Sequence, residues 1–423
     1  MSFGGAGGRP IPVLLMVREL DQGGVERDVA KIATHLDRSR FEPHVASYHN
    51  HGMRYEELLA AGVPFLHLPV AAPVSRAGFA AGIRLARYLS KHGIRLLHSY
   101  DTTCVLGVPV ARSLGLPAVI ASQLSYRSLM DWRTRLLSRM MDPLCDAVLV
   151  NCEAMRRHMI EDERMPAARV ELCYNGVDTG RFYPAEAPRP EAVAGASLVI
   201  GTVCALRPEK GLPLLQEAFA RVGGQDRKMK LLIVGSGSEL PRLEGNAARM
   251  GIGGASVFIP AAYDVAAWLR AIDIFVLPSS SEAFSNALLE AMACGCAAVG
   301  SRVGGTPELI GQDERGLLFS SGDGADLAAK LSKLIENQPL RRELAGRAAR
   351  FARENLTIEI AARRTGEIYE KLLRRNAAET GPPRSRSAVG ASQAAGGSDD
   401  SHGRSSEIQV ADPPGRGGVH GLS

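Results

Sequence analysis

Residues 274–301 read IFVLPSSSEAFSNALLEAMACGCAAVGS, and they contain a complete strand–loop–helix–strand pattern. A short apolar run, Ile274–Leu277, leads through a serine-rich loop to a helical pattern over Asn286–Cys294 and a second apolar run over Ala297–Ser301. Continuous apolar strands that alternate with helices predict a parallel sheet covered on both faces. Because ligands bind beyond the carboxyl ends of such strands, we expect functional residues in the loops that follow strands.

The same alternation occurs in two blocks of the chain. The first block begins with the apolar run Ile11–Val17, and the second begins with Leu198–Val203. A proline-rich stretch between the blocks predicts a linker. We therefore predict an α/β fold with two Rossmann-like, doubly wound domains that face a central cleft. The predicted segments are an N-terminal domain over 1–182, a linker over 183–195, a C-terminal domain over 196–357, an amphipathic helix over 358–376 and a disordered tail over 377–423.

Composition and charge narrow the class of protein. The 423 residues are 45% apolar and 22% charged, as in ordinary globular chains. The net charge is +5 without a strongly basic block, which argues against nucleic-acid binding but suits an anionic small-molecule substrate. The seven cysteines are scattered and form no C-x-x-C pair, so we expect reduced, mostly buried thiols.

The reduced thiols predict a cytoplasmic protein. We expect no transmembrane helix, since no apolar stretch reaches the roughly 18 residues that one needs. Peripheral contact with the inner face of the membrane is an open alternative. The stretches Arg76–Arg95 and Tyr126–Arg139 mix basic and apolar side chains, as interfacial helices do. Both could equally be ordinary helices that cover a sheet.

The strongest functional signal is the loop and helix that contain Glu282 and Glu290. The free backbone N–H groups of Phe284, Ser285 and Asn286 would form an anion site at a helix N-terminus. Carboxylates repel phosphate but accept hydrogen bonds from sugar hydroxyls, so the combination suits a nucleotide sugar. The alternative is a helix-capping box followed by a solvated glutamate.

Other candidates follow other predicted strands. Arg207 and Lys210 are three residues apart after the strand Leu198–Val203, and together they could bind a diphosphate, or they could be solvated charges of a turn. Gly23 and Gly24 would let a ligand approach the backbone, or form a plain tight turn. Weaker candidates for the cleft are His98, Gln123, Arg127 and Asn175. We predict no metal site, because no ligand set has the usual spacing.

Over roughly residues 11–376 the chain resembles the retaining glycosyltransferases of family 4, which have the GT-B fold. The resemblance rests on Glu282-x7-Glu290 within the sequence context quoted above, because the bare spacing would be unspecific. Supporting matches are Arg207, Lys210-Gly211, Asn175-Gly-Val-Asp178, Gly23-Gly24 and Gly304-Gly-Thr-Pro-Glu308. The last of these motifs follows a strand and could also place N–H groups against a phosphate.

The resemblance implies a role for each motif. The C-terminal domain would bind a UDP- or GDP-linked sugar, and the N-terminal domain would bind the acceptor. The implied catalytic residues are Arg207, Lys210 and Glu282. The implied donor-binding residues are Gly23, Gly24, Ala261, Phe284, Ser285, Asn286 and Glu290, and the acceptor-side residues are His98, Gln123, Arg127 and Asn175. Many relatives carry a histidine where this chain has the loop with Gln123 and Arg127. The last helix would pack on the N-terminal domain.

The function that follows is transfer of a hexose, with retention and without a metal or a cofactor, to a hydroxyl acceptor. A bacterial glycan, a lipid-linked precursor or an exopolysaccharide would be the acceptor. Alternatives are a GT-B nucleotide-sugar epimerase and a non-catalytic nucleotide-sugar binder. A nicotinamide-dependent oxidoreductase is less consistent with the sequence, because the G-x-G-x-x-G pattern is absent.

Overall fold

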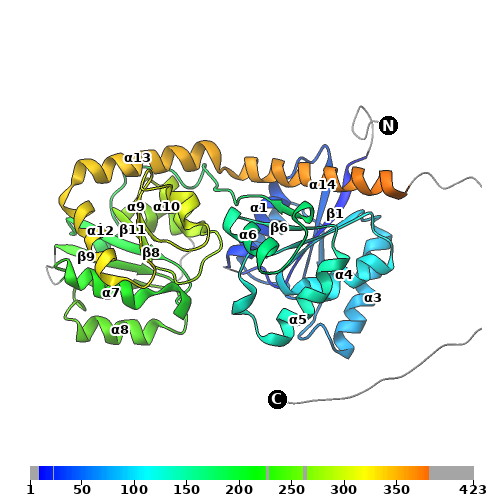
Figure 1. Ribbon diagram of the computed structural model, residues 1–423, viewed down its shortest axis with the longest axis horizontal. Coiled ribbons are helices and arrows are strands. Elements are labelled where there is room, and N and C mark those ends of the chain that lie inside the picture. The colour runs from blue at the N-terminus through cyan, green and yellow to red at the C-terminus, as the bar shows by residue number, and fades with distance from the viewer. Residues whose placement is uncertain (1–8, 22, 225–227, 261–263, 381–423) are drawn as a thin grey trace, which may run out of the picture. The chain divides into compact units, whose positions relative to one another are not determined.

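The computed structural model describes residues 9–21, 23–224, 228–260 and 264–380. The N-terminal domain contains a seven-stranded parallel sheet (Figure 1). Its strands are β1 (Ile11–Val17), β2 (Phe41–Ser47), β3 (Phe65–His67), β4 (Leu96–Tyr100), β5 (Ala118–Ser122), β6 (Ala147–Val150) and β7 (Val170–Leu172). They are ordered β3-β2-β1-β4-β5-β6-β7, so the order reverses between β1 and β4.

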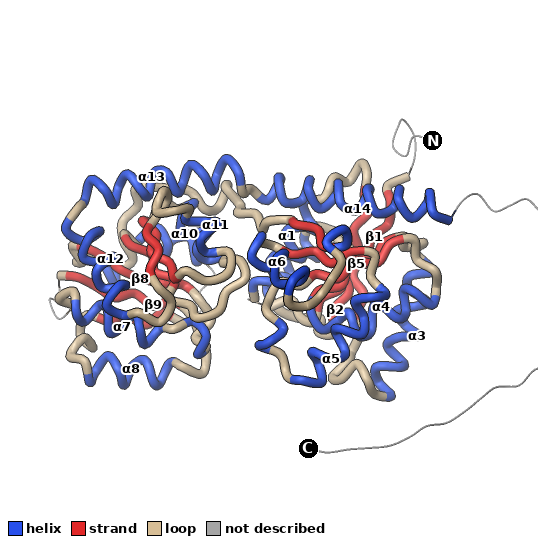
Figure 2. The backbone as a smooth tube through the Cα atoms, in the orientation of Figure 1, coloured by secondary structure: helices blue, strands red, loops and turns tan. Residues whose placement is uncertain are grey.

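The C-terminal domain contains a six-stranded parallel sheet (Figure 2). Its strands are β8 (Leu198–Val203), β9 (Met229–Val234), β10 (Ser256–Ile259), β11 (Ile274–Leu277), β12 (Ala297–Ser301) and β13 (Leu317–Phe319). The order is β10-β9-β8-β11-β12-β13, with the reversal between β8 and β11. The predicted α/β class with two Rossmann-like domains is confirmed, while the exact domain boundaries stay predictions.

Helices connect the strands of both sheets. The helices of the N-terminal domain are α1 (Gly24–His35), α2 (Met53–Ala60), α3 (Arg76–Lys91), α4 (Cys104–Ser113), α5 (Trp132–Met141) and α6 (Glu153–Glu161). Those of the C-terminal domain are α7 (Leu212–Arg221), α8 (Leu240–Arg249), α9 (Val265–Ala271), α10 (Asn286–Ala293), α11 (Thr306–Ile310), α12 (Gly324–Glu336) and α13 (Gln338–Asn355). The last helix, α14, spans Ile358–Thr380.

The strand β1 shows why the sheets appear in the sequence as continuous apolar runs. Successive side chains of a strand point to opposite faces of the sheet. Leu14 and Met16 belong to the core that also contains residues of α3 and α4, whereas Val13 and Leu15 belong to the core shared with α1 and α14. Both faces are therefore buried, and every position of the strand needs an apolar side chain.

The helix α14 packs on the N-terminal domain. Ile368, Tyr369 and Leu372 are buried in the same core as β1, and the Tyr369 ring meets Phe41 edge-on at 5.7 Å between ring centroids. The helix reaches Thr380, four residues beyond the predicted end at 376, so the first four residues of the predicted tail are helical. The remainder of that predicted tail lies outside the described residues. None of the described helices has the length and apolarity needed to cross a membrane.

The expectation that His98 lies on the acceptor side of the cleft is wrong. The side chain is completely buried under α14. Its Nδ1 lies 2.7 Å from the Tyr369 hydroxyl, and its Nε2 lies 2.7 Å from the Ser122 hydroxyl. Burial lowers the pKa of His98 to about 3, so the ring is neutral. Both ring nitrogens are occupied by neighbours, and the residue helps to dock α14 on the sheet.

Replacing Tyr369 with Phe would test this docking role. The Tyr369→Phe variant leaves a buried ring nitrogen of His98 without its partner, which costs about 1–3 kcal/mol of unfolding free energy. Urea denaturation measures this loss. The control Tyr183→Phe alters a side chain that is 41% exposed and should shift stability by less than about 0.5 kcal/mol. Wild-type stability of Tyr369→Phe would contradict the bond between Tyr369 and His98.

Candidate active site

A cavity of about 570 Å³ is lined by the loops that follow β1, β8 and β11 and by the first turns of α1 and α10. In open parallel sheets, ligands bind at the carboxyl ends of strands where the strand order reverses. The cavity lies at such positions in both sheets. The predicted site residues that line it are Gly23, Gly24, Asn175, Arg207, Lys210, Glu282, Phe284, Ser285, Asn286 and Glu290.

The loops after β8 and β11 bring a cation and a carboxylate together. Lys210 Nζ lies 2.7 Å from Glu282 Oε2, and the same oxygen accepts a hydrogen bond from the Ser279 hydroxyl at 3.1 Å. Both side chains of the ion pair are partly exposed to the cavity. The pair places one positive and one negative group side by side, ready to bind a ligand that carries both phosphates and hydroxyls.

Two glycines fix the loops that carry this pair. Gly211 has φ 64°, and a Cβ there would lie 2.2 Å from the carbonyl oxygen of Pro278. Gly304 has φ 49°, and a Cβ there would lie 1.6 Å from the carbonyl oxygen of Glu282. Only glycine adopts these conformations with such close backbone contacts. The backbones beside Lys210 and Glu282 are therefore held by packing that no side chain could replace.

The Gly304–Glu308 motif does not line the cavity, and the N–H groups of Gly305, Thr306 and Glu308 donate within the protein, so the structure does not support the expectation that they face a phosphate. The N–H of Gly305 donates to the carbonyl of Ala283 at 2.6 Å. The Glu308 carboxylate accepts, at 2.9 Å each, from the first two backbone N–H groups of α6 and from the Tyr174 hydroxyl. The motif supports the loop with Glu282 and joins the two domains.

Arg207 is the most accessible of the predicted catalytic residues. Its side chain is 63% exposed, and its nearest carboxylate is that of Glu209, 3.7 Å away. An exposed ion pair at this distance contributes little to stability. The guanidinium can therefore turn toward a ligand in the cavity at small cost.

Glu290 forms the principal ion pair between the two domains. The residue is only 1% exposed and stands among buried apolar residues of α10, which is an unusual environment for a carboxylate. Arg27 of α1 donates to its Oε1, and Lys31 Nζ lies 3.9 Å from the same oxygen. Among the described residues, no hydrogen bond reaches the other oxygen, Oε2. One oxygen of the carboxylate is thus committed to the protein, and the other can accept from a ligand.

The charges of this group determine the pKa values. Burial alone would raise the pKa of Glu290, but Arg27 and Lys31 outweigh it and the pKa is lowered. Burial raises the pKa of the neighbouring Asp28 to about 6, although Lys31, Arg27 and Asn286 act in the opposite direction. Glu290 is therefore a charged acceptor in the neutral pH range.

Asn286 also bridges the domains, at the first position of α10. Its Nδ2 donates to both oxygens of Asp28 at 3.1 and 3.2 Å, and its Oδ1 accepts from Asn175 Nδ2 at 3.1 Å. The Ser285 hydroxyl caps the helix by accepting from Leu288 N. These bonds orient the helix N-terminus, which the sequence predicted as an anion site, toward the N-terminal domain.

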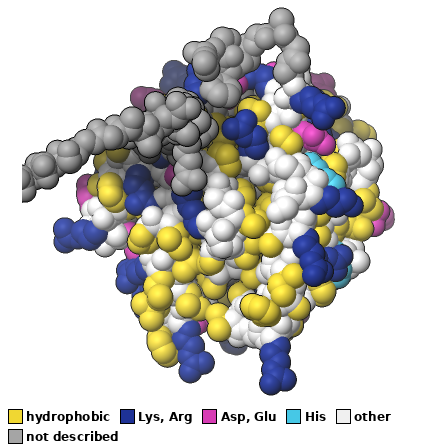
Figure 3. All heavy atoms as spheres, turned by 90° about the vertical axis from the view of Figure 1, so that its right-hand side faces the viewer, with side chains coloured by type: hydrophobic (Ala, Val, Ile, Leu, Met, Phe, Trp, Pro, Cys, Tyr) yellow, Lys and Arg dark blue, Asp and Glu magenta, His cyan; other side chains and the backbone are white. Residues whose placement is uncertain are grey.

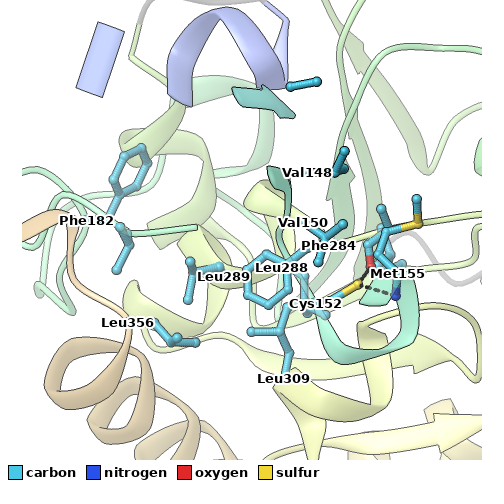
Figure 4. Packing of buried hydrophobic residues seen from close by; sticks show 14 of the residues in the cluster. Val148, Val150, Cys152, Met155, Phe182, Phe284, Leu288, Leu289, Leu309 and Leu356 are labelled. Carbon is cyan, nitrogen blue, oxygen red and sulfur yellow. Dashed lines mark hydrogen bonds between the residues drawn. The ribbon is translucent and has the colours of Figure 1, made fainter. Parts of the chain in front are cut away.

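Apolar packing accompanies these polar bridges. Phe284 and Leu288 belong to one buried cluster with Val150 and Cys152 of the N-terminal domain (Figure 4). The Cys152 thiol donates to the carbonyl of Ala283 at 3.2 Å. The loop after β11 is thus held by the core of both domains, which gives the site a preformed wall.

Gln123 and Arg127 do not line the cavity, so the expectation that they contact substrate is wrong. Both are buried. Arg127 donates to both carboxylate oxygens of Asp142 at 2.7 Å, and to Glu163 at 3.1 Å. Its Nε donates to the side-chain oxygen of Gln123 at 3.0 Å. The predicted base-binding residue Ala261 lies outside the described residues.

Sequence reasoning missed the charged face of α1. Arg27, Asp28 and Lys31 line the cavity together with Gly24. These four positions follow the spacing i, i+3, i+4 and i+7, which places them on one face of a helix. The signal was therefore available: a charged stripe that begins directly after the predicted Gly-Gly turn. Among the described residues, no cluster of three or more His, Cys, Asp or Glu side chains has metal-binding geometry.

Comparison with known proteins places the fold and the family. Residues 22–181 match the family described as Glycosyltransferase Family 4, and residues 185–351 match Glycosyl transferases group 1. Among solved structures, the chain is similar to HepE of Anabaena in complex with UDP and glucose, with a TM-score of 0.75 and 19% identity. That alignment covers 85% of this chain and 100% of the other. The likeness shows the GT-B fold of glycosyltransferases.

Curated relatives agree with these matches. The chain is 26% identical over 409 residues to the D-inositol 3-phosphate glycosyltransferase of Nocardioides sp., which covers 87% of this chain and 86% of that one. It is 31% identical over 224 residues to the enzyme of the same name from Stackebrandtia nassauensis, and it spans about half the length of that relative. The chain belongs to family 4 of the GT-B glycosyltransferases.

The bridge between Arg27 and Glu290 can be tested by a double-mutant cycle. Glu290→Met leaves Arg27 and Lys31 with only Asp28 to compensate them, so we expect a loss of about 3 kcal/mol in the free energy of unfolding, the low end for breaking a buried ion pair. Arg27→Met should cost a similar amount, and combining Arg27→Met with Glu290→Met should cost clearly less than the sum. Urea denaturation measures each value. Strict additivity would contradict the bridge.

Proposed function

We propose that this chain is a retaining, metal-independent hexosyltransferase that uses a UDP- or GDP-linked sugar as donor. The observation that carries the proposal is the pair of Lys210 and Glu282, 2.7 Å apart in the cavity where the loops after β8 and β11 meet. The acceptor would be a hydroxyl of a glycan, a lipid-linked precursor or an exopolysaccharide, bound by the N-terminal domain. The nucleotide sugar is a co-substrate, and no cofactor is proposed.

Arg207 and Lys210 would stabilise the departing diphosphate. Negative charge grows on the phosphates as the bond to the sugar breaks, and cations aimed at that charge lower the barrier. Two cations supply the positive charge for which many phosphate-transferring sites use a metal ion. When the donor binds, Lys210 would exchange its ion pair with Glu282 for one with the donor's phosphates. The Glu282 carboxylate would then be available to accept hydrogen bonds from the sugar.

Glu282 and Glu290 would then accept from hydroxyls of the donor. Glu282, positioned by Ser279, would orient the sugar ring, while Oε2 of Glu290 would accept from the ribose. The N–H groups of Phe284 and Ser285 donate no hydrogen bond within the described residues, and they would face the donor's sugar and phosphate. Gly23 and Gly24 would approach the diphosphate from the other domain.

Retention of the anomeric configuration follows from the resemblance to family 4. The acceptor hydroxyl would attack from the face that the diphosphate leaves, through an oxocarbenium-like state. The departing phosphate oxygen would take the proton of the acceptor hydroxyl. Separate cleavage of the donor by water would be the measurable side reaction when no acceptor is present.

The role of Lys210 predicts a rate effect. Lys210→Ala should lower kcat for transfer or hydrolysis of the accepted donor by about 10²–10³-fold, as for loss of one group that stabilises transition-state charge. Glu282→Gln should lower it as well. The control Lys330→Ala removes a cation on α12, far along the chain from the cavity loops, and should leave the rate unchanged.

A panel of UDP- and GDP-sugars, followed by chromatography of the nucleotide and NMR of the product anomer, measures these effects. An inverted anomer would overturn retention. A changed sugar that is still attached to the nucleotide would identify an epimerase. Donor binding without turnover would identify a non-catalytic binder, and unchanged rates in Lys210→Ala and Glu282→Gln would overturn the proposed site.

A further inference from the structure

Exposed apolar side chains are concentrated in one part of the molecule. Eleven large apolar residues are exposed within the described residues, and nine of them lie between residues 74 and 144. These nine are Val74, Phe79, Ile83, Leu114, Leu129, Trp132, Leu136, Met140 and Leu144. Phe79 is 74% exposed and Trp132 is 64% exposed. Single exposed apolar side chains are normal, but such a concentration indicates an interaction surface.

The nine residues lie on or beside three neighbouring helices. The helix α4 packs against both α3 and α5. Their inward side chains, such as Leu85 of α3 and Leu106 of α4, belong to the core. Figure 3 looks onto the side of the molecule that carries α3, and it shows apolar side chains gathered there with Lys and Arg side chains projecting around them. We call the outward surface of these helices the α3–α5 face.

The charged side chains of the three helices are all positive, and the exposed acidic residue beside them, Asp131, caps the N-terminus of α5. The sequences of α3, α4 and α5 contain no Asp or Glu and eight Lys or Arg residues. Arg112 and Arg139 are paired with acidic neighbours. Arg76, Arg84 and Arg87 are exposed and form no ion pair with any described residue.

The side-chain composition of the α3–α5 face favours a lipid surface over a second copy of the chain as its partner. Aromatic and aliphatic side chains beside unpaired arginines are the composition of surfaces that bind at the lipid headgroup level. Each basic residue near an anionic lipid surface adds attraction. A symmetric dimer through the same face would instead place arginines of both copies together, and like charges across an interface are costly.

We propose that the α3–α5 face docks on an anionic lipid bilayer, with Phe79 and Trp132 entering the headgroup region. Docking itself does not depend on the donor chemistry. One consequence rests on the proposed function: because the face belongs to the proposed acceptor domain, it favours an acceptor that is carried by the membrane.

Co-sedimentation of the full chain with vesicles tests the proposal. We expect binding to vesicles with equal parts phosphatidylglycerol and phosphatidylcholine, weak binding to pure phosphatidylcholine, and release by salt. Arg84→Gln and Arg87→Gln should each lower the partition coefficient about fivefold. Phe79→Ser combined with Trp132→Ser should lower it at least as much. The control Leu59→Ser alters an exposed apolar side chain of α2 outside the face and should bind as wild type.

Three results would overturn the proposal. One is wild-type chain that stays in the supernatant with anionic vesicles. Another is equal partition for wild type and the Phe79→Ser, Trp132→Ser variant. The third is a wild-type dimer in sedimentation velocity that is absent in the Phe79→Ser, Trp132→Ser variant. That result would show that the face is a self-association surface. The variants change exposed side chains only, so we expect unchanged melting temperatures and unchanged donor hydrolysis. Loss of vesicle binding tests membrane docking, whereas loss of donor hydrolysis in the wild type tests the proposed function, so the two proposals can fail separately.

Discussion

A buried carboxylate must be paired, and Glu290 meets this constraint across the two domains. Its charge on α10 is compensated by Arg27 and Lys31 of α1. Because α1 and α10 line opposite sides of the cavity with their first turns, these ion pairs connect the two sides. The hydrogen bonds of Asn286 with Asp28 and Asn175 add further links between the domains at the same helix start. The relative placement of the cavity walls depends on this group of contacts.

The cavity is lined by two ion pairs, each of which consists of one cation and one carboxylate. Lys210 with Glu282 lies within the C-terminal domain, and Arg27 with Glu290 lies between the domains. Each pair compensates its own charges without a ligand, and each presents the groups that a nucleoside diphosphate sugar requires, cations for phosphates and carboxylates for hydroxyls. Donor binding would exchange partners in the pair of Lys210 and Glu282 and would leave Arg27 on Oε1 of Glu290, so the buried charge of Glu290 stays compensated.

The sequence predicted the elements with strong patterns. The strands Leu198–Val203 and Ala297–Ser301 have the predicted bounds, because fully buried strands show as continuous apolar runs. The strands β7 and β13 were missed; each has only three residues, and β7 contains the charged Glu171. The cavity-lining glycines and glutamates were found because their loops follow such strands.

Failures at the site have a common physical cause. Arg127 and His98 follow or lie in strands, as functional residues do, but their partners come from distant parts of the chain. Asp142 and Glu163 neutralise Arg127, and Tyr369, 271 positions from His98, occupies its ring. A single sequence does not show such tertiary partners. The charged face of α1 could have been found, because its helical spacing is visible in the sequence.

A crystal structure of the protein with UDP or GDP bound tests the proposed donor site most directly. The diphosphate should lie within hydrogen-bonding distance of Arg207 and Lys210, with a ribose hydroxyl on Glu290 and the bond between Lys210 and Glu282 lengthened. A diphosphate bound away from Arg207 and Lys210, with both cation–carboxylate pairs unchanged, would contradict the assignment of this cavity as the donor site.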